Sequence, residues 1–359
     1  MFDFPTSPTI GQVSGNYTWN GYAWMPQSSA APLDALAYSG MQINGSFDVS
    51  QELGAVGTAT GPYFCDGWKG AKSGPMVCLG TATPVVGYIP GFPIVGLYQA
   101  TTPQASLGAA EYAVMQQPIE GYRVARLSWG YASAKPITVA FWSGHTPAGV
   151  YSLTVRNSAA TRSYGTTYTQ AVAAVPQYNV ITIPGCTDGV WEITNMPGLV
   201  FTLAMASGTT YTAPSANSWL SGSVYLAAPG QINGVVTLNN IMRVTGYLVL
   251  PGIYAPTAAQ SALIMRPYGE ELVTCKRYWE RTNFYFGGTA SFAGAVASII
   301  VPISAEKRVN PTITQFAQGA SNFTWSGWLG GVRSAGVTGT TPAAGQYVMD
   351  YAVNVDARL

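Results

Sequence analysis

The feature that most restricts the fold of this chain is a series of short runs rich in β-branched and aromatic residues. Each run is bounded by Gly, Pro, Asn or Ser, a pattern typical of strands joined by turns in an antiparallel sandwich. In the first run, the side chains of Ile137, Val139 and Phe141 would share one face, because successive strand residues point to opposite sides. The runs lie at 136–143, 149–157, 178–184, 198–206 and 234–250. They predict a mainly β protein, and the lack of a repeat of about 20 to 50 residues disfavours a solenoid or propeller.

Charged residues are scarce in this chain. They make up only 9% of the 359 residues, against roughly 25% in an average globular domain. The net charge of +1 gives no electrostatic footprint for nucleic acid or for an anionic lipid surface. A surface made polar by hydroxyl, amide and aromatic groups instead suits a sugar ligand or burial against copies of the same chain.

The longest charge-free tract invites a membrane interpretation, but the prolines and glycines within residues 73–110 break any spanning helix. We therefore expect no membrane insertion. The part 79–103 is our candidate for surface buried between the chains of a homotrimer, since exposed apolar patches of that size are rare on monomers. It equally suits a long loop packed on its own sandwich.

The N-terminus and the cysteines bear on the compartment. MFDFPTSPTI has no basic stretch followed by an apolar run, so we expect no cleaved signal peptide. The four cysteines lack metal-type spacing, and a chain made in the cytosol would usually keep them reduced. We interpret them as small core residues, with a bridge between Cys65 and Cys78 as the alternative.

One segment, residues 266–281, is crowded with charge. Acidic residues come first and basic residues last, the order that complements a helix dipole. Apolar residues at three- and four-residue spacing predict an amphipathic helix from about 267 to 281. The acidic residues are Glu270 and Glu271, the basic ones Lys276, Arg277 and Arg281, and the apolar ones Leu272, Cys275, Tyr278 and Trp279. We expect the charges to lie outside both neighbouring cores, on a solvated face or in pairs between chains.

Six stretches carry a family resemblance: MQINGSFDVSQE (41–52), YFCDGWK (63–69), residues 104–142, SLTVRNSAATRSYGTTYT (152–169), RVTGYLVLPGIYAPT (243–257) and RPYGEELVTCKRYW (266–279). Together they resemble a domain common in bacteriophage tail-fibre and receptor-binding proteins, over roughly residues 39 to 281. In that family the region is similar to a carbohydrate-binding-module jelly roll. The opening, residues 4–26, resembles a hairpin module of phage tail proteins, and YAVNVDARL resembles the closing strand of such fibres.

The resemblance implies a jelly-roll β-sandwich (39–265), a short linking helix (266–282) and a second, C-terminal β domain (283–359). Residues 1–38 would form a module that attaches to other virion proteins, and the C-terminal domain would be the receptor-binding tip. The family further implies a homotrimer on the virion, assembled in the host cytoplasm, that contacts host-surface polysaccharide.

A metal site of the family type is not expected. Related jelly rolls often carry a calcium-binding acidic residue near the end of the last strand, but Leu250 stands at that position here. Asp48, Glu52 and Asp66 alone are too few oxygen ligands for Ca²⁺. We expect no cofactor either.

Catalytic signatures are weak, so we expect a protein that is not an enzyme. The single histidine, His145, lies in a Gly- and Pro-flanked turn and is interpreted as a surface residue. No context of a nucleophile surrounds it. Glu270 and Glu271 are adjacent on the predicted helix and splay apart, whereas glycan hydrolysis needs two carboxylates facing one bond. A pair assembled by folding or between chains stays open.

Sugar binding is the stronger hypothesis, because aromatic rings stack on the C–H faces of sugars. The candidates are Trp129, Tyr131, Trp219, Trp325 and Trp328. For Trp129 and Trp219 the alternative is a core position. Trp325 and Trp328 are favoured because Ser, Asn and Gly surround them, with Asn310, Gln315 and Arg333 as weaker polar companions.

Two functions remain open. One is a tail fibre or receptor-binding protein that recognises host-surface glycans. The other is a head fibre, capsid decoration or collar protein, whose sandwich serves assembly.

Overall fold

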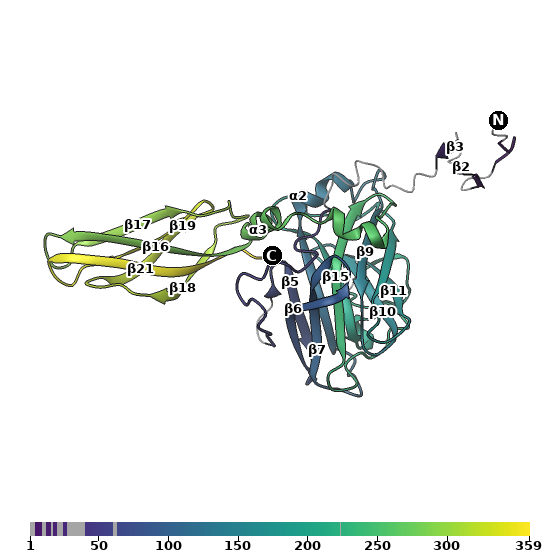
Figure 1. Ribbon diagram of the computed structural model, residues 1–359, viewed down its shortest axis with the longest axis horizontal. Coiled ribbons are helices and arrows are strands. Elements are labelled where there is room, and N and C mark those ends of the chain that lie inside the picture. Colours follow the sequence, from purple (N-terminus) through teal and green to yellow (C-terminus); the bar gives the residue numbers. More distant parts are fainter. Residues whose placement is uncertain are drawn as a thin grey trace.

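The computed structural model describes residues 4–8, 12–15, 17–19, 24–26, 40–59, 63–222 and 224–359. The chain is mainly β, which confirms the predicted fold class, and two antiparallel β bodies meet at a short helix (Figure 1). Near the N-terminus, β1 (Val13–Ser14), β2 (Tyr17–Trp19) and β3 (Trp24–Pro26) form a separate antiparallel sheet. The boundary expected near residue 38 falls outside the described residues.

The larger body is a jelly-roll sandwich of two antiparallel sheets. The seven-stranded sheet has the order β14-β11-β10-β13-β8-β5-β4, and the five-stranded sheet has the order β12-β9-β15-β7-β6. The first contains β4 (Tyr63–Cys65), β5 (Trp68–Ser73), β8 (Tyr112–Glu120), β10 (Gly149–Arg156), β11 (Arg162–Gln170), β13 (Pro197–Ser207) and β14 (Trp219–Ser221). The second contains β6 (Val77–Ile89), β7 (Phe92–Thr102), β9 (Ile137–Ser143), β12 (Gln177–Ile183) and β15 (Ile241–Pro251).

Short helices lie between these strands. They are α2 (Gly121–Val124) and the 3-10 turns η1 (Ala125–Leu127), η2 (Thr209–Tyr211) and η3 (Ala258–Ile264). No helix of the described residues is long and apolar enough to cross a bilayer.

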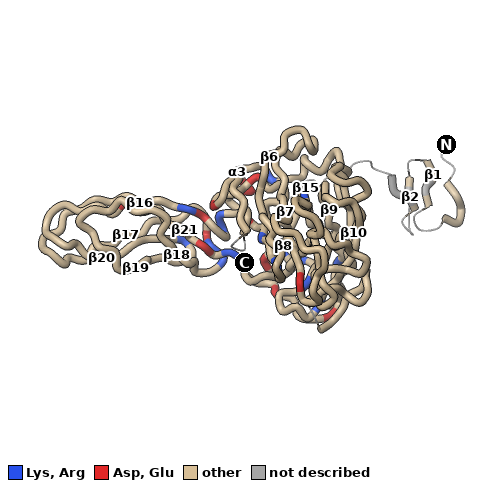
Figure 2. The backbone as a smooth tube through the Cα atoms, turned by 90° about the horizontal axis from the view of Figure 1, so that it is seen from below, with Lys and Arg blue, Asp and Glu red and all other residues tan. Residues whose placement is uncertain are grey.

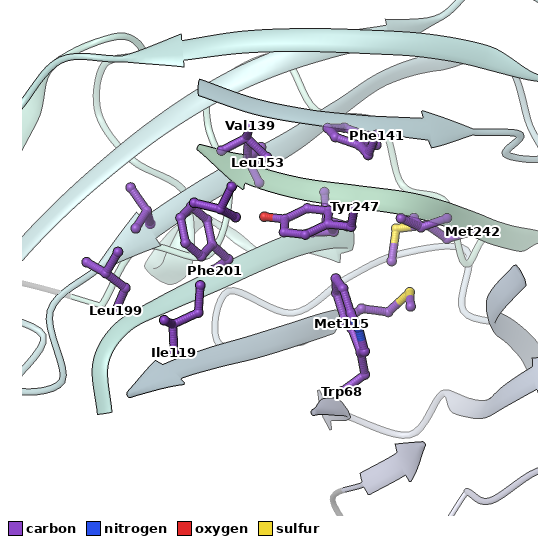
Figure 3. Close-up of a cluster of buried hydrophobic side chains, with 14 of the residues drawn as sticks. Trp68, Met115, Ile119, Val139, Phe141, Leu153, Leu199, Phe201, Met242 and Tyr247 are labelled. Carbon is purple, nitrogen blue, oxygen red and sulfur yellow. The ribbon is translucent and has the colours of Figure 1, made fainter. Parts of the chain in front are cut away.

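The core of the sandwich lies between the facing sheets (Figure 3). Phe141 and Tyr247 of the five-stranded sheet meet Phe201 of the seven-stranded sheet, and Tyr247 also packs edge-on against Trp68 at 5.0 Å. These rings are 1% exposed or less, and aromatic residues of this size dominate the burial of apolar surface.

Strand β9 shows why both faces of its run are apolar. Ile137, Val139 and Phe141 point into the sandwich, as the alternation predicts. Ala140 lies on the opposite face, where Ile264, the last residue of η3, packs against it. A strand covered on both sides needs an apolar residue at nearly every position, so simple alternation of polar and apolar residues is lost.

The other predicted strands are present with one difference. The run 234–250 is a strand only from Ile241, because residues 234–239 form turns. Asn239 has φ 63°, the left-handed conformation that Asn tolerates better than most residues. This turn redirects the chain into β15.

The charge-free tract 79–103 is a hairpin of β6 and β7 rather than a long loop. Val95, Tyr98 and Ala100 are buried, whereas Val86 near the tip is 92% exposed. All four cysteines are buried with free thiols, so they are core residues and the alternative bridge between Cys65 and Cys78 is not formed.

The smaller body, residues 279–356, is a narrow sandwich that we call the finger (Figure 1). Its two three-stranded sheets have the orders β16-β21-β18 and β17-β20-β19. The strands are β16 (Trp279–Ala290), β17 (Val296–Pro302), β18 (Thr312–Gln318), β19 (Thr324–Gly331), β20 (Ser334–Thr340) and β21 (Gly345–Asp356). Val337, Tyr351 and Val353 belong to the small core between the sheets.

The segment 266–281, which we call the joint, contains helix α3 (Tyr268–Lys276) and ends in the first residues of β16. The helix is shorter than predicted because Trp279 already pairs with Asp356 in the finger. Cys275 and Tyr278 are buried against Ile43 and Val49 of the sandwich, as the apolar spacing led us to expect.

The expectation that the charges of the joint lie outside both cores is wrong for several of them. Charged residues gather where the two bodies meet (Figure 2). Glu271 and Arg266 form a 2.8 Å ion pair with side chains only 5% and 9% exposed. Glu280 and Lys307 form a second pair at 3.1 Å that is 1% and 0% exposed.

Partners remote in the sequence explain this burial. Arg277 of the joint donates to both carboxylate oxygens of Glu120, at 2.6 and 2.9 Å, and Tyr278 donates to the same carboxylate at 2.9 Å. Glu120 is the last residue of β8, so the contact fixes the end of α3 to the sandwich. Buried charges need such partners because desolvation is costly.

A row of alternating rings and guanidinium groups also crosses the joint. Arg358 lies over Tyr63 of the sandwich at 4.8 Å and over Trp279 at 5.8 Å. Arg281 lies over Trp279 at 5.5 Å and over Phe316 of the finger at 3.4 Å. Cation–π contacts of this kind contribute about 0.5–2 kcal/mol each, so the row stiffens the connection between the bodies.

Candidate functional site

Two of the predicted site residues form a pair on the finger. Trp325 and Trp328 lie on the edge strand β19 with ring centroids 5.6 Å apart. A shift in the pairing register between Trp325 and Gly327 turns both indoles to the same face, since their partners Gly339 and Val337 are two residues apart. Trp328 is covered by Tyr351, whereas Trp325 is 44% exposed.

The surroundings of this pair are polar and uncharged. Ser326 donates a hydrogen bond to the Thr338 carbonyl, and Asn322 donates to the carbonyls of Ala343 and Gln346. These amide and hydroxyl groups support the backbone around Trp325. Of the weaker companions, Arg333 lies away from the pair, in an exposed ion pair with Glu306. The arrangement offers one indole face to a flat apolar group such as the C–H face of a sugar.

The other tryptophans serve the sandwich core. Trp129 is only 3% exposed and packs edge-on against Trp191 at 4.7 Å and Trp219 at 5.2 Å. It therefore has no free ring face for a sugar, and its sequence-based assignment as a candidate is corrected to a core residue. Trp219 is partly buried in the same cluster, and its indole N–H donates to the Pro184 carbonyl.

Trp191 is the member of this cluster that sequence reasoning missed. Residues 187–196 have no regular strand, so no periodicity marks Trp191 as a core residue. Tyr131, by contrast, is 70% exposed in the loop after η1. It remains accessible to a ligand, although no second candidate ring packs against it.

The histidine is not a surface residue. His145 is fully buried, and its Nδ1 accepts the backbone N–H of Arg243 at 3.1 Å. Nε2 must then carry the proton and donate to the Tyr168 hydroxyl at 2.8 Å. Burial, together with the nearby Arg243 charge, lowers the pKa of His145 to about 3, so the ring is neutral near pH 7. The turn is covered because Tyr151 and Tyr168 pack on the imidazole.

The buried carboxylates of the joint are paired with cationic side chains. The described residues contain no group of three or more Cys, His, Asp or Glu that could hold a metal ion. Arg266 donates to the carbonyls of Gly40 and Gln42 and to the Glu271 carboxylate.

Comparison with known proteins adds only distant similarities. No family model and no curated protein match the chain. Among solved structures, a tailspike protein 4 enzymatically active domain of bacteriophage CBA120 is 10% identical with a TM-score of 0.32. The match covers 55% of this chain and only 21% of the tailspike chain.

Carbohydrate-binding modules are also among the similar structures. A family 11 module of Clostridium thermocellum, solved with a β-1,3-1,4-mixed-linked tetrasaccharide, is 10% identical with a TM-score of 0.27, and the match covers 55% of this chain and 97% of the module. TmCBM61, solved with β-1,4-galactotriose, is 8% identical with the same TM-score, over 53% of this chain and 91% of the module. These similarities are too weak to identify a function.

Proposed function

We propose that this protein is a structural virion protein of a bacteriophage, a tail fibre or receptor-binding protein that recognises host-surface glycans through its finger. The observation that carries the proposal is the surface of the finger. Beyond the joint, residues 282–305 and 309–349 together contain a single charged residue, Arg333. Large apolar side chains are exposed there nevertheless, namely Tyr285, Phe286, Phe292, Val296, Ile300, Phe316 and Trp325. Such a surface is typical of a region that contacts other molecules.

The joint supports a mechanical role. Two buried ion pairs, the Glu120 contact and the row of rings and guanidinium groups hold the finger at one end of the sandwich. A stiff connection keeps a binding surface at a set distance and angle from its attachment point. The family resemblance places virion attachment at the N-terminal module and host contact toward the C-terminus, which fits this arrangement.

Trimerisation belongs to the same proposal. Three fingers packed side by side would bury part of the apolar surface and leave the remaining rings for the host. Light scattering at micromolar concentration should then give three times the chain mass of 37.8 kDa. A monomeric mass would contradict the homotrimer without affecting the sugar-binding part of the proposal.

Binding is tested on host-surface polysaccharide with two single substitutions. Trp325→Ala removes the exposed indole and should weaken binding at least tenfold, about 1.4 kcal/mol. Tyr131→Ala removes a ring that is 70% exposed on the sandwich and should change binding little. Equal losses in both variants, or none in Trp325→Ala, would contradict a finger-based site. The polysaccharide should keep its chain length during incubation, because we propose binding without cleavage.

The location on the virion separates the two functions that the sequence left open. Antibody raised against the finger should label the tail in electron micrographs of whole particles. Labelling of the head or the collar would instead favour a decoration or collar protein. Adsorption of particles carrying Trp325→Ala to host cells gives an independent readout of receptor recognition.

A further inference from the structure

A groove on the sandwich, beside the joint, lies outside the surfaces considered so far. It has a volume of about 260 Å³ and opens between residues 47–55, the hairpin of β6 and β7, and the first residue of α3. Its position is set by the joint, since α3 is held against the sandwich by Cys275 and Tyr278. The groove lies on the sandwich, whereas the exposed aromatic residues of the proposed sugar site lie on the finger.

The walls of the groove are apolar, with an aromatic ring at the rim. Ala82 and Pro84 of β6 and Ile94 of β7 line one side. Tyr268 also lines the groove and is 60% exposed. Among the described residues that line the groove, it is the only one with an exposed aromatic ring. An exposed tyrosine beside aliphatic side chains provides a surface on which the C–H face of a pyranose can stack.

Asp48 supplies the one carboxylate among the described residues that line the groove, beside the polar residues Ser50 and Gln51. Oδ2 of Asp48 accepts the Ser46 hydroxyl at 2.6 Å, which sets the orientation of the carboxylate. Within the described part of the chain, Asp48 forms no ion pair. Its burial without a cation raises its pKa, against the lowering effect of the Ser46 hydrogen bond. The Ser46 hydroxyl uses only Oδ2, so Oδ1 of Asp48 keeps acceptor capacity for a ligand.

The neighbouring Asp66 shows what a structural carboxylate looks like in the same region. Its two oxygens accept the backbone N–H and the side-chain amide of Gln51, each at 2.8 Å. Asp66 thus fixes the segment 50–52, and its acceptor capacity is used within the fold. Asp48 has no such role, since within the described residues the Ser46 hydroxyl is the only side-chain donor to its carboxylate.

We infer that this groove binds one sugar ring of an uncharged glycan, with Tyr268 stacked on the ring and Asp48 accepting its hydroxyl groups. Carboxylate acceptors form hydrogen bonds roughly twice as strong as neutral ones, which suits a ligand whose donors are hydroxyl groups. An organic ammonium group is the competing ligand, because it would also be attracted to a carboxylate and a ring. It is disfavoured because aromatic cages for such cations have several ring faces, and here one ring is exposed. The inference goes beyond the proposed function, because the groove is separate from the finger.

The test uses the full-length protein and a panel of methyl glycosides of glucose, galactose, mannose and N-acetylglucosamine. Saturation-transfer NMR at millimolar concentration should detect binding of at least one of them. Tyr268→Ala should weaken that binding about tenfold, and Tyr268→Phe should keep it, because the ring and not the hydroxyl is used. Asp48→Asn, which has the same shape, should also weaken it about tenfold because the charge-assisted hydrogen bonds are lost.

The controls separate the groove from the finger and from general damage. Tyr122 is 60% exposed like Tyr268 but does not line the groove, so Tyr122→Ala should bind as the parent does. The Tyr268 and Asp48 variants are also compared in a Trp325→Ala background, where sugar bound by the finger does not contribute, so failure of the finger site and failure of the groove are distinguishable. The inference is overturned if no glycoside binds, if Asp48→Asn and Tyr268→Ala bind as well as the parent, or if tetramethylammonium binds and the glycosides do not.

Discussion

The buried ion pair of the joint gives the sharpest prediction about stability. Lys307 and Glu280 lie 3.1 Å apart with essentially no exposed surface, and burial lowers the pKa of Lys307. Lys307→Met leaves the Glu280 carboxylate buried without a cation, which should cost about 3–5 kcal/mol. Glu280→Leu leaves the ammonium group unpaired and should cost a similar amount.

The double variant should be no more destabilised than either single one, although it carries both substitutions. When both charges are removed, no uncompensated buried charge remains, and paired replacement by apolar residues is often nearly neutral. What remains is the loss of two weaker hydrogen bonds, from Lys307 to the Lys276 carbonyl and from the Ser304 N–H to Glu280. Unsatisfied groups of this kind cost about 1–3 kcal/mol each, so the double variant should lose roughly 4 kcal/mol against roughly 8 kcal/mol for the two single variants added together, a coupling energy of about 4 kcal/mol.

Native-state hydrogen exchange of peptides spanning 276–290 is the suitable assay, because a chain with several bodies does not unfold as one unit. Arg333→Met is the matched control, because the ion pair of Arg333 with Glu306 is exposed to solvent. The side chain of Arg333 is 78% exposed and that of Glu306 is 50% exposed. It should change protection by less than about 1 kcal/mol. The reasoning is refuted if Lys307→Met costs no more than this control, or if the single and double variants are simply additive.

Three further predictions concern the sandwich. As pH falls from about 6.5 toward 3, the unfolded chain protonates His145 and the folded one does not, so stability should fall by up to about 1.4 kcal/mol per pH unit from this group. Because Asp66, with a pKa raised to about 6, acts in the opposite direction, the readout is the difference from His145→Gln, and equal pH profiles would contradict it. Ellman's reagent should modify none of the four buried thiols quickly in the native protein and all four in guanidinium; fast labelling of the folded chain would mean that a thiol is exposed. Gly246→Ala should destabilise the chain by about 1–3 kcal/mol in denaturant titrations, because φ is +58° and the new methyl would lie 2.7 Å from Phe92; a variant as stable as the parent would show that β15 relaxes there.

The sequence alone determined the fold class and the local faces of its strands. The alternation in residues 137–142 placed Ile137, Val139 and Phe141 toward the core, because strand geometry depends only on neighbouring residues. The apolar spacing around Cys275 and Tyr278 likewise predicted which side of the joint is packed. The composition also identified the cysteines as core residues, since small apolar side chains without metal spacing are most often buried.

Only the tertiary structure decided what the polar and aromatic residues do. Glu271 and Glu280 have the sequence pattern of a solvated helix, yet Arg266 and Lys307 make their burial tolerable. His145 follows a turn pattern, but tyrosines from other strands cover it. Trp129 is a core residue because Trp191 and Trp219, from distant segments of the chain, pack against its ring. The groove at Asp48 depends in the same way on a hairpin and a helix far along the chain. Local periodicity reports which face of an element is apolar, whereas burial of a charge or a ring depends on what remote segments bring to it, and no local pattern encodes that.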